Sequence, residues 1–162
     1  KSVCRIRKRR TGSMLVGSSS HMLDGKNRMR IPAAFKDDMA GPIIMSVSVN
    51  GCIAVYTEEV YDELFSSYKN VHAFDAKTQA RYSKIFRYTF PVAEDNQGRI
   101  LVPEELRKYA GIKKELVTVG KLNHLEIWAP DRLDSLDGGE AYEDIFSGLF
   151  EASKNDNDKN GI

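Results

Sequence analysis

The stretch Asp24-Gly25-Lys26-Asn27-Arg28-Met29-Arg30-Ile31-Pro32 has a counterpart, Asp95-Asn96-Gln97-Gly98-Arg99-Ile100-Leu101-Val102-Pro103, that begins 71 residues later. In both, an Asp stands four residues before an Arg, and an aliphatic residue and a Pro follow at the same spacing. A short helical pattern comes next and ends at Gly41 in one copy and at Gly111 in the other. A match of this length indicates two copies of one structural unit. Each copy is predicted to run strand, turn, strand, helix, hairpin, helix.

Local signals support this unit. Asn50-Gly51 predicts a two-residue hairpin turn, because both residues tolerate a positive φ. Pro32 and Pro103 stand where a helix is predicted to begin, a position that proline favours. The predicted hairpin strands are Val47–Val49, Ile53–Tyr56, Val117–Val119 and Leu125–Trp128.

The composition is that of a soluble globular protein. The chain has 162 residues, of which 41% are hydrophobic and 29% charged. Cys4 and Cys52 are too few for a disulfide framework and indicate reduced thiols in a cytoplasmic protein. The net charge of +1 is a cancellation: residues 1–13 hold six bases and no acid, whereas residues 131–162 hold nine acids and three bases. The average therefore hides two polarised ends.

The duplicated turn has two interpretations. In the first, the Asp side chain caps a β-turn and pairs with the Arg, which is purely structural. In the second, the Asp orients the Arg toward a phosphate or a guanine edge. The second is favoured, because turn chemistry alone does not require Arg at the same place twice. Lys26, Arg28 and Arg30 make the first copy the more basic surface, and Arg99 is the equivalent base in the second.

Several segments resemble one known family. The resemblance is carried by Met14-Leu15-Val16-Gly17, by His21 to Arg28, by Ile31-Pro32-Ala33, by Asp95 to Pro103 and by Leu125-Glu126-Ile127-Trp128. Together they resemble the MraZ family over residues 14–136.

The resemblance implies a bacterial transcriptional regulator without catalytic activity, located in the cytoplasm and associated with the nucleoid. The implied fold is α+β, with two tandem swapped-hairpin AbrB-like β-barrel modules and short helices in one pseudo-two-fold domain. The implied assembly is a ring-shaped homo-oligomer. The implied partner is double-stranded DNA, bound at short direct repeats in the promoter of the division and cell-wall gene cluster.

The resemblance also assigns roles to residues of the two motifs. Arg28 is the expected DNA contact, Lys26 matches a basic turn position, and Arg99 is the Arg of the second motif. Arg30 is a DNA-binding candidate on its spacing alone. Asn27 stands where the family usually has Gly, and Asn also enters the left-handed region. The residues expected to form the structural turns are Asp24, Asn27, Asp95 and Gly98.

These assignments predict five segments. Residues 1–13 are a basic extension, which we favour as non-native over a nucleic-acid-binding arm. Residues 14–68 and 91–136 are the two modules, and residues 69–90 are a linking helix. Residues 137–162 are an acidic tail, predicted to be helical only in Tyr142–Phe150 and otherwise disordered.

Catalysis is disfavoured. His21, His72 and His124 are far apart, and neither a metal-binding spacing nor a nucleotide-binding or nucleophile motif is found. No cofactor, metal, small-molecule substrate or membrane is therefore expected.

Two alternatives stay open. AbrB-type modules also serve as antitoxins or protein-interaction modules, and the acidic tail would then wrap a partner protein. Lys77, Arg81 and Lys84 recur on one face of the linking helix, which indicates a solvated face more than a phosphate-tracking surface.

Overall fold

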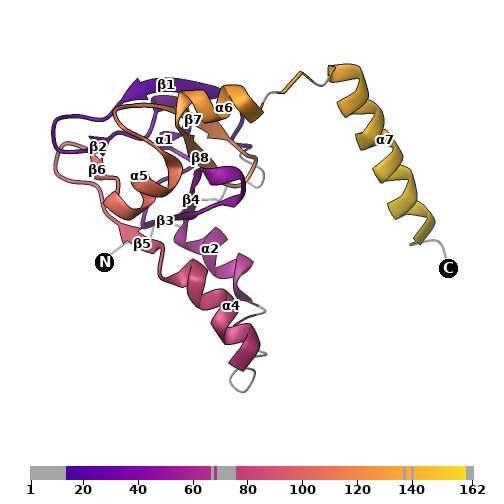
Figure 1. Cartoon of the computed structure of the whole chain (residues 1–162), viewed down its shortest axis with the longest axis horizontal. Coiled ribbons are helices and arrows are strands. Elements are labelled where there is room, and N and C mark those ends of the chain that lie inside the picture. The colour runs from indigo at the N-terminus through magenta and orange to yellow at the C-terminus, as the bar shows by residue number, and fades with distance from the viewer. Residues whose placement is uncertain (1–13, 67, 69–75, 137, 140, 160–162) are drawn as a thin grey trace, which may run out of the picture. The chain divides into compact units, whose positions relative to one another are not determined.

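The computed structural model describes residues 14–66, 68, 76–136, 138, 139 and 141–159. These residues divide into two compact units, one that ends at Pro130 and one that begins at Asp131. The first unit mixes strands and short helices, which confirms the predicted α+β class (Figure 1). Its elements are β1 (Ser18–Met22), β2 (Arg28–Met29), α1 (Ala33–Lys36), β3 (Ile43–Val47), a 3-10 turn (Val49–Gly51), β4 (Ile53–Thr57), α2 (Glu58–Leu64), α4 (Ala76–Phe86), β5 (Thr89–Val92), β6 (Ile100–Leu101), α5 (Glu104–Ala110), β7 (Glu115–Gly120) and β8 (Leu125–Trp128).

Six strands form one antiparallel sheet in the order β1-β7-β8-β4-β3-β5. The two hairpins, β3–β4 and β7–β8, meet at its centre, where Ala54 pairs with Glu126. The outer strands are exchanged: β1 of the first copy pairs with β7 of the second, and β5 of the second pairs with β3 of the first. Each half therefore completes the hairpin of the other half. β5 begins two residues before the predicted start of the second module.

The chain ahead of β1 is held closely against the second half. Leu15 and Leu122 exchange two backbone hydrogen bonds, of 2.8 and 2.7 Å. A Cβ added to Gly120 would lie 2.6 Å from the backbone carbon of Leu15, so only glycine fits at this crossing.

The strands β2 and β6 pair with each other as a separate two-stranded sheet, the β2–β6 ribbon. Met29 and Ile100 are opposite each other and point into the common core, where both are at most 2% exposed. Residues that alternate with them face outward, as the period of a strand requires. The ribbon is thereby anchored by apolar side chains on one face, while its other face carries Arg28 and the exposed Leu101.

A turn with positive φ at Asn50 and Gly51 forms as predicted, with φ of 63° and 78°. With Val47 paired to Ile53, however, the turn takes up the three residues Val49–Gly51 and not the two that were predicted. The strand predicted at Val47–Val49 is wrong in its bounds: β3 ends at Val47, and Val49 already belongs to the turn. The N–H of Ser48 donates to the carbonyl of Cys52. This hydrogen bond is the last one between the two strands, so the loop begins at Val49, which the apolar pattern had placed in the strand.

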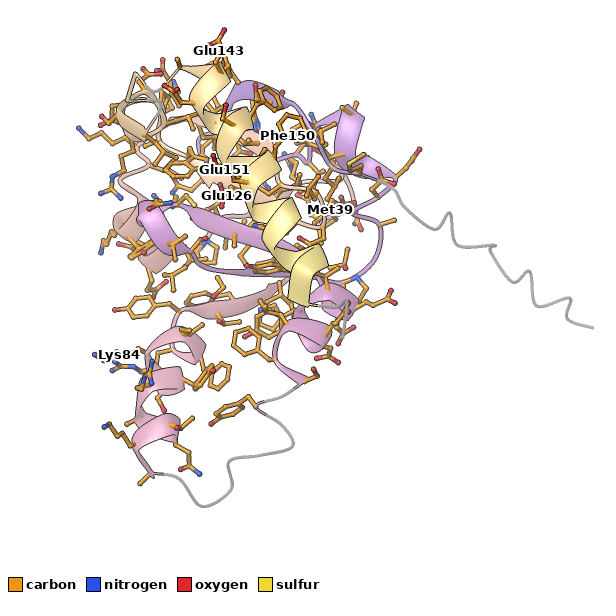
Figure 2. The ribbon with its side chains drawn as sticks, turned by 90° about the vertical axis from the view of Figure 1, so that its right-hand side faces the viewer. Met39, Lys84, Glu126, Glu143, Phe150 and Glu151 are labelled. Atoms are coloured by element: carbon orange, nitrogen blue, oxygen red, sulfur yellow. The ribbon has the colours of Figure 1, made fainter. Side chains whose placement is uncertain are left out.

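The helices α2 and α4 pack through aromatic side chains. The ring of Phe65 lies 4.6 Å from that of Tyr61 and 5.4 Å from that of Phe86, between ring centroids. α4 falls within the predicted linking helix, and Lys84 projects outward from it (Figure 2). Residues 69–75, also assigned to that segment, lie outside the described residues.

The second unit contains the end of α6 (Pro130–Leu136) and α7 (Tyr142–Lys159). The helix expected at Tyr142–Phe150 is present, but it continues for nine further residues, which were predicted to be disordered. Extending a formed helix needs no new nucleus, so weak helix formers can continue it. Among the described residues, no helix is both long and apolar enough to cross a bilayer.

Candidate nucleic-acid interface

The first motif folds into a turn that is closed by its own Asp. Oδ1 of Asp24 accepts the backbone N–H groups of Lys26 at 2.8 Å and of Arg28 at 3.0 Å. The N–H of Asp24 donates to the carbonyl of Arg28 at 2.9 Å. Asn27 takes the left-handed conformation, with φ of 58°. This is the Asp-capped turn that the sequence predicted.

The second motif has the same geometry. Oδ1 of Asp95 accepts the N–H groups of Gln97 at 2.9 Å and of Arg99 at 3.0 Å. Gly98 has φ of 69°, close to that of Asn27. Asn in place of Gly therefore leaves the first turn intact.

The two turns are joined by an Arg–Asp network. Nη2 of Arg28 lies 2.7 Å from Oδ2 of Asp24, and its Nη1 lies 3.4 Å from Oδ2 of Asp95. Arg99 mirrors this, with Nη2 2.8 Å from Asp95 and Nη1 3.9 Å from Asp24. Each Nε–H also donates to its own Asp at 2.8 Å. Each guanidinium thus faces the carboxylates of both copies, although sequence reasoning had paired each with only one.

The network is electrically neutral. The hydrogen bond from the Arg99 side chain, with the backbone N–H donors of the turn, lowers the pKa of Asp95 to about 2. The equivalent bond from Arg28 holds the pKa of Asp24 well below its usual range. Both carboxylates are therefore ionised at neutral pH and balance the two guanidiniums. Any net positive charge on this surface must come from other side chains.

Lys26 and Arg30 supply that charge. Both are exposed, and among the described residues neither forms an ion pair. They do not sit together, however: the Nε–H of Arg30 donates to the carbonyl of Gln97, 3.2 Å away in the second turn. The basic patch that the sequence placed on the first copy is therefore divided between the two turns.

Sequence reasoning missed Lys36. This residue is the last of α1, and its Nζ would lie 3.1 Å from a Cβ added to Gly98. The helix that follows the first motif thus carries a third cation to the second turn. No signal in the sequence marked this position, because the predicted helix ends at Gly41 and places Lys36 in its middle; this prediction was wrong, since α1 ends at Lys36.

The remaining candidate groups form no second centre among the described residues. No three His, Cys, Asp or Glu side chains there are grouped so that they could share a metal ion. Nε2 of His21 is 2.8 Å from the hydroxyl of Thr118 and is held within the sheet. Burial raises the pKa of the Cys52 thiol to about 12, so that thiol stays protonated. Cys4 and His72 lie outside the described residues.

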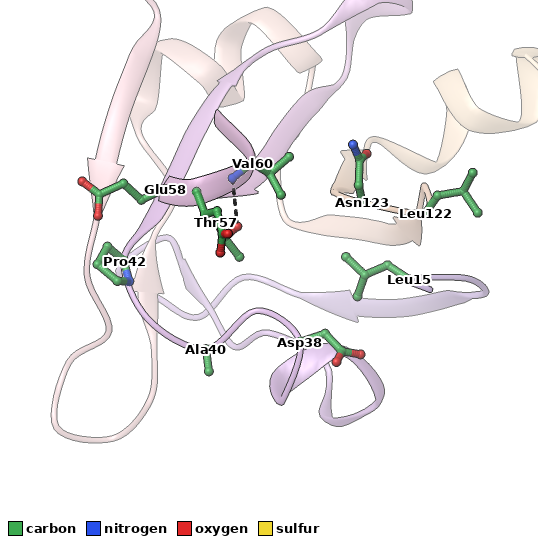
Figure 3. A pocket seen from close by; sticks show the side chains of 10 residues that line it. Leu15, Asp38, Ala40, Pro42, Thr57, Glu58, Val60, Leu122 and Asn123 are labelled. Carbon is green, nitrogen blue, oxygen red and sulfur yellow. Dashed lines mark hydrogen bonds between the residues drawn. The ribbon is translucent and has the colours of Figure 1, made fainter. Parts of the chain in front are cut away.

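A cavity of about 470 Å³ lies beside α2 (Figure 3). Its lining includes the carboxylates of Asp38, Glu58 and Glu59. The hydroxyl of Thr57 accepts the N–H of Val60 at the start of α2, which fixes this wall. An acidic lining repels phosphate, so this cavity does not extend the basic surface.

Comparison with known proteins places the chain in a family. The family described as "MraZ protein, putative antitoxin-like" matches residues 14–82 and 85–160. A protein named "Transcriptional regulator MraZ" from Lachnoclostridium phytofermentans is 34% identical over 126 residues, which are 75% of this chain and 86% of the relative. One of that name from Clostridium botulinum is 34% identical over 119 residues, 74% of this chain and 84% of the relative. One from Saccharopolyspora erythraea is 29% identical over 143 residues, 85% of this chain and all of the relative. With both halves matched and this identity, the chain belongs to the MraZ family.

Proposed function

We propose that this protein is a sequence-specific DNA-binding transcriptional regulator whose DNA-contacting surface is the outer face of the β2–β6 ribbon with its two turns. One observation carries the proposal: the duplicated motifs are joined into a single surface in which Lys26 and Arg30 stand exposed around a neutral Arg–Asp network. The names of the relatives as transcriptional regulators support the same role.

The wider proposal concerns fold and assembly. The exchange of β1 and β5 between the halves supports two swapped-hairpin AbrB-like modules related by a pseudo-two-fold. We propose a ring-shaped homo-oligomer in the bacterial cytoplasm that binds short direct repeats in the promoter of the division and cell-wall gene cluster and associates with the nucleoid. A surface with so few free cations gains affinity when several copies engage repeated sites.

Within the surface, Lys26 and Arg30 are proposed as direct contacts. Arg28 and Arg99 add the N–H groups that their carboxylates leave free, and their side chains are 22% and 25% exposed. Removing Arg28 would unbalance the network, so its loss would combine a binding defect with a structural one. The DNA surface is therefore better tested at the two exposed cations.

The test is selection of bound fragments from the source genome, followed by mobility shift on the selected DNA. We expect the double variant Lys26→Ala/Arg30→Ala to lose binding while its thermal melting stays that of the wild type. Lys84→Ala, which removes an exposed cation from α4, is the matched control and should bind normally. Normal binding by the double variant would contradict the assignment of Lys26 and Arg30 as DNA contacts.

A second candidate function rests on α7. Tyr142, Ile145, Phe146, Leu149 and Phe150 follow helical spacing, and each is between 42% and 78% exposed. Such a stripe is the pattern of a helix that enters an apolar groove of a protein partner. A chain truncated after Gly139 separates the two functions: it should keep DNA binding if α7 serves only a partner. A small toxin gene directly downstream, neutralised only by the full-length chain, would favour the antitoxin function.

A further inference from the structure

The outer face of the β2–β6 ribbon repeats its backbone but not its side chains. Positions 71 residues apart hold Lys26 and Gln97 in the two turns, and Arg30 and Leu101 in the strands. The two ends of the surface therefore differ chemically, although the turns that form them contain equivalent hydrogen bonds from backbone N–H groups to the Asp side chain.

The antiparallel register decides which of these side chains are neighbours. Arg28 pairs with Leu101 and Met29 with Ile100, so continuing the register by one residue sets Arg30 opposite Arg99. The hydrogen bond from Nε of Arg30 to the carbonyl of Gln97 agrees with that placement. Lys26 lies in the first turn, and Arg30 binds the carbonyl of Gln97 in the second turn. The two motif cations that have no carboxylate partner among the described residues are therefore at opposite ends of the ribbon.

These two cations are held in different ways. The Lys26 backbone is fixed by Asp24, but among the described residues its ammonium group contacts no acceptor. Arg30 is anchored through Nε, and its terminal nitrogens have no partner among the described residues. Arg28 and Arg99, in contrast, direct Nη1 and Nη2 at carboxylates. Arg30 is thus the motif guanidinium whose planar fork stays open to a ligand.

An open, oriented guanidinium fork fits two adjacent acceptors, and the O6 and N7 atoms of guanine form such a pair in the major groove. A mobile ammonium on a long stem is a point charge suited to phosphate. Resting on the DNA-binding function proposed above, we infer that Arg30 is a specificity-determining residue that reads guanine, and that Lys26 is a sequence-independent phosphate anchor. One subunit then binds an asymmetric DNA element in one orientation, with the guanine at the Gln97 end.

Arg30→Lys tests the inference, because it keeps the charge and removes the fork. Binding is measured by fluorescence anisotropy on two duplexes: one that the wild-type protein selects from random-sequence DNA, and a shuffled duplex of the same composition. Arg30→Lys should weaken binding to the selected duplex by about 5- to 150-fold and leave the shuffled duplex nearly unchanged. When the selection is repeated with this variant, the enriched sequence should no longer contain one of the guanines that the wild-type protein selects.

Lys26→Ala should behave differently. Binding to both duplexes should weaken by a similar factor. The slope of log affinity against log salt concentration should fall in magnitude by about one per contacting subunit. Arg81→Lys and Lys84→Ala repeat the two chemical changes on α4 and should alter neither quantity. Thermal melting of each variant shows that the fold is kept.

The outcomes separate this inference from the function beneath it. A wild-type protein that enriches no sequence would overturn both. A wild-type protein that enriches a sequence, with an Arg30→Lys variant that keeps the full ratio between the two duplexes, would overturn only the role of Arg30. Loss of discrimination in Lys26→Ala but not in Arg30→Lys would reverse the two assignments.

Discussion

At the scale of single residues, each motif carboxylate performs three tasks. Oδ1 of Asp24 caps its own turn, while Oδ2 pairs with Arg28 and also faces Arg99 of the other copy. Asp95 does the same in the second turn. A side chain that caps a turn and crosses to the other half links local structure to tertiary structure. The Asp and the Arg of both copies therefore have a structural function in addition to any contact with a ligand.

The first prediction concerns acid stability. Because Asp24 and Asp95 have pKa values below the ordinary 3.8 in the folded state, the unfolded chain takes up protons first as the pH falls. Their contribution to stability is therefore present above about pH 4 and is lost as the pH falls toward the folded pKa values. The wild-type melting temperature should drop between about pH 4 and about pH 2.

The double variant Asp24→Asn/Asp95→Asn should melt lower at neutral pH and show a smaller drop in acid, as measured by circular dichroism. Asp37→Asn removes an exposed carboxylate outside the network and is the control. Parallel pH profiles for the double variant and the wild type would show that the network is not the source of the acid sensitivity.

At the scale of elements, the sequence predicted what short-range chemistry determines. The Asn50-Gly51 turn, the left-handed Gly111 at the end of α5 and the Asp-capped turns all form where their residue types require. Pro32 and Pro103 were predicted as the first helical residues, and this is wrong by one position: each is the residue before the helix, with a non-helical ψ of 142° or 141°. These features depend on φ preferences and on bonds that span a few residues.

Strand partners were not predictable in the same way. Alternation shows which side chains of a strand are buried, but not which strand lies beside it. The exchange of β1 and β5 depends on pairings between residues about 45 to 100 positions apart, which no local pattern encodes. The same register carries Arg30 to Gln97, so the basic residues that are close in sequence separate in space.

The exchange of strands yields the second prediction. The halves are joined by four strand pairings, β1–β7, β3–β5, β4–β8 and β2–β6. They also share one core, in which Met29 and Phe35 of the first half and Ile100 and Leu106 of the second are all buried. Cutting the chain between α2 and α4 should therefore leave both fragments folded and associated.

A protease site inserted within residues 69–75 makes the cut. After cleavage, the fragments should coelute in size-exclusion chromatography under native conditions and keep the circular dichroism spectrum of the intact protein. They should separate only in denaturant. The same protein before cleavage is the control and should give the elution and the spectrum of the wild type. Fragments that separate under native conditions would contradict the exchanged pairing.

At the scale of the whole molecule, charge limits how this protein can bind DNA. Without residues 1–13, the chain has 18 bases and 23 acids, a net charge of −5. The Arg–Asp network contributes nothing to the net charge. Among the described residues, the cations placed at the two turns include Lys26, Arg30 and Lys36, and the carboxylate of Glu94 lies near Gly98 together with Lys36. Two or three side chains that neutralise phosphates contribute little binding free energy, and this contribution falls further as the salt concentration rises. Because the net charge is negative, long-range electrostatic attraction between the whole protein and DNA cannot supply the missing affinity.

The third prediction follows from this limit. If copies of the chain assemble, the solution mass from light scattering should be a multiple of 18.2 kDa. Affinity should then rise steeply with the number of repeats in the DNA, by about 10²- to 10⁴-fold from one repeat to several, because later contacts form at high effective concentration. Changing the spacing between repeats by half a helical turn should abolish this gain, since neighbouring sites then face opposite sides of the duplex. A monomeric chain that binds one repeat as tightly as four would show that a single β2–β6 ribbon is sufficient for binding.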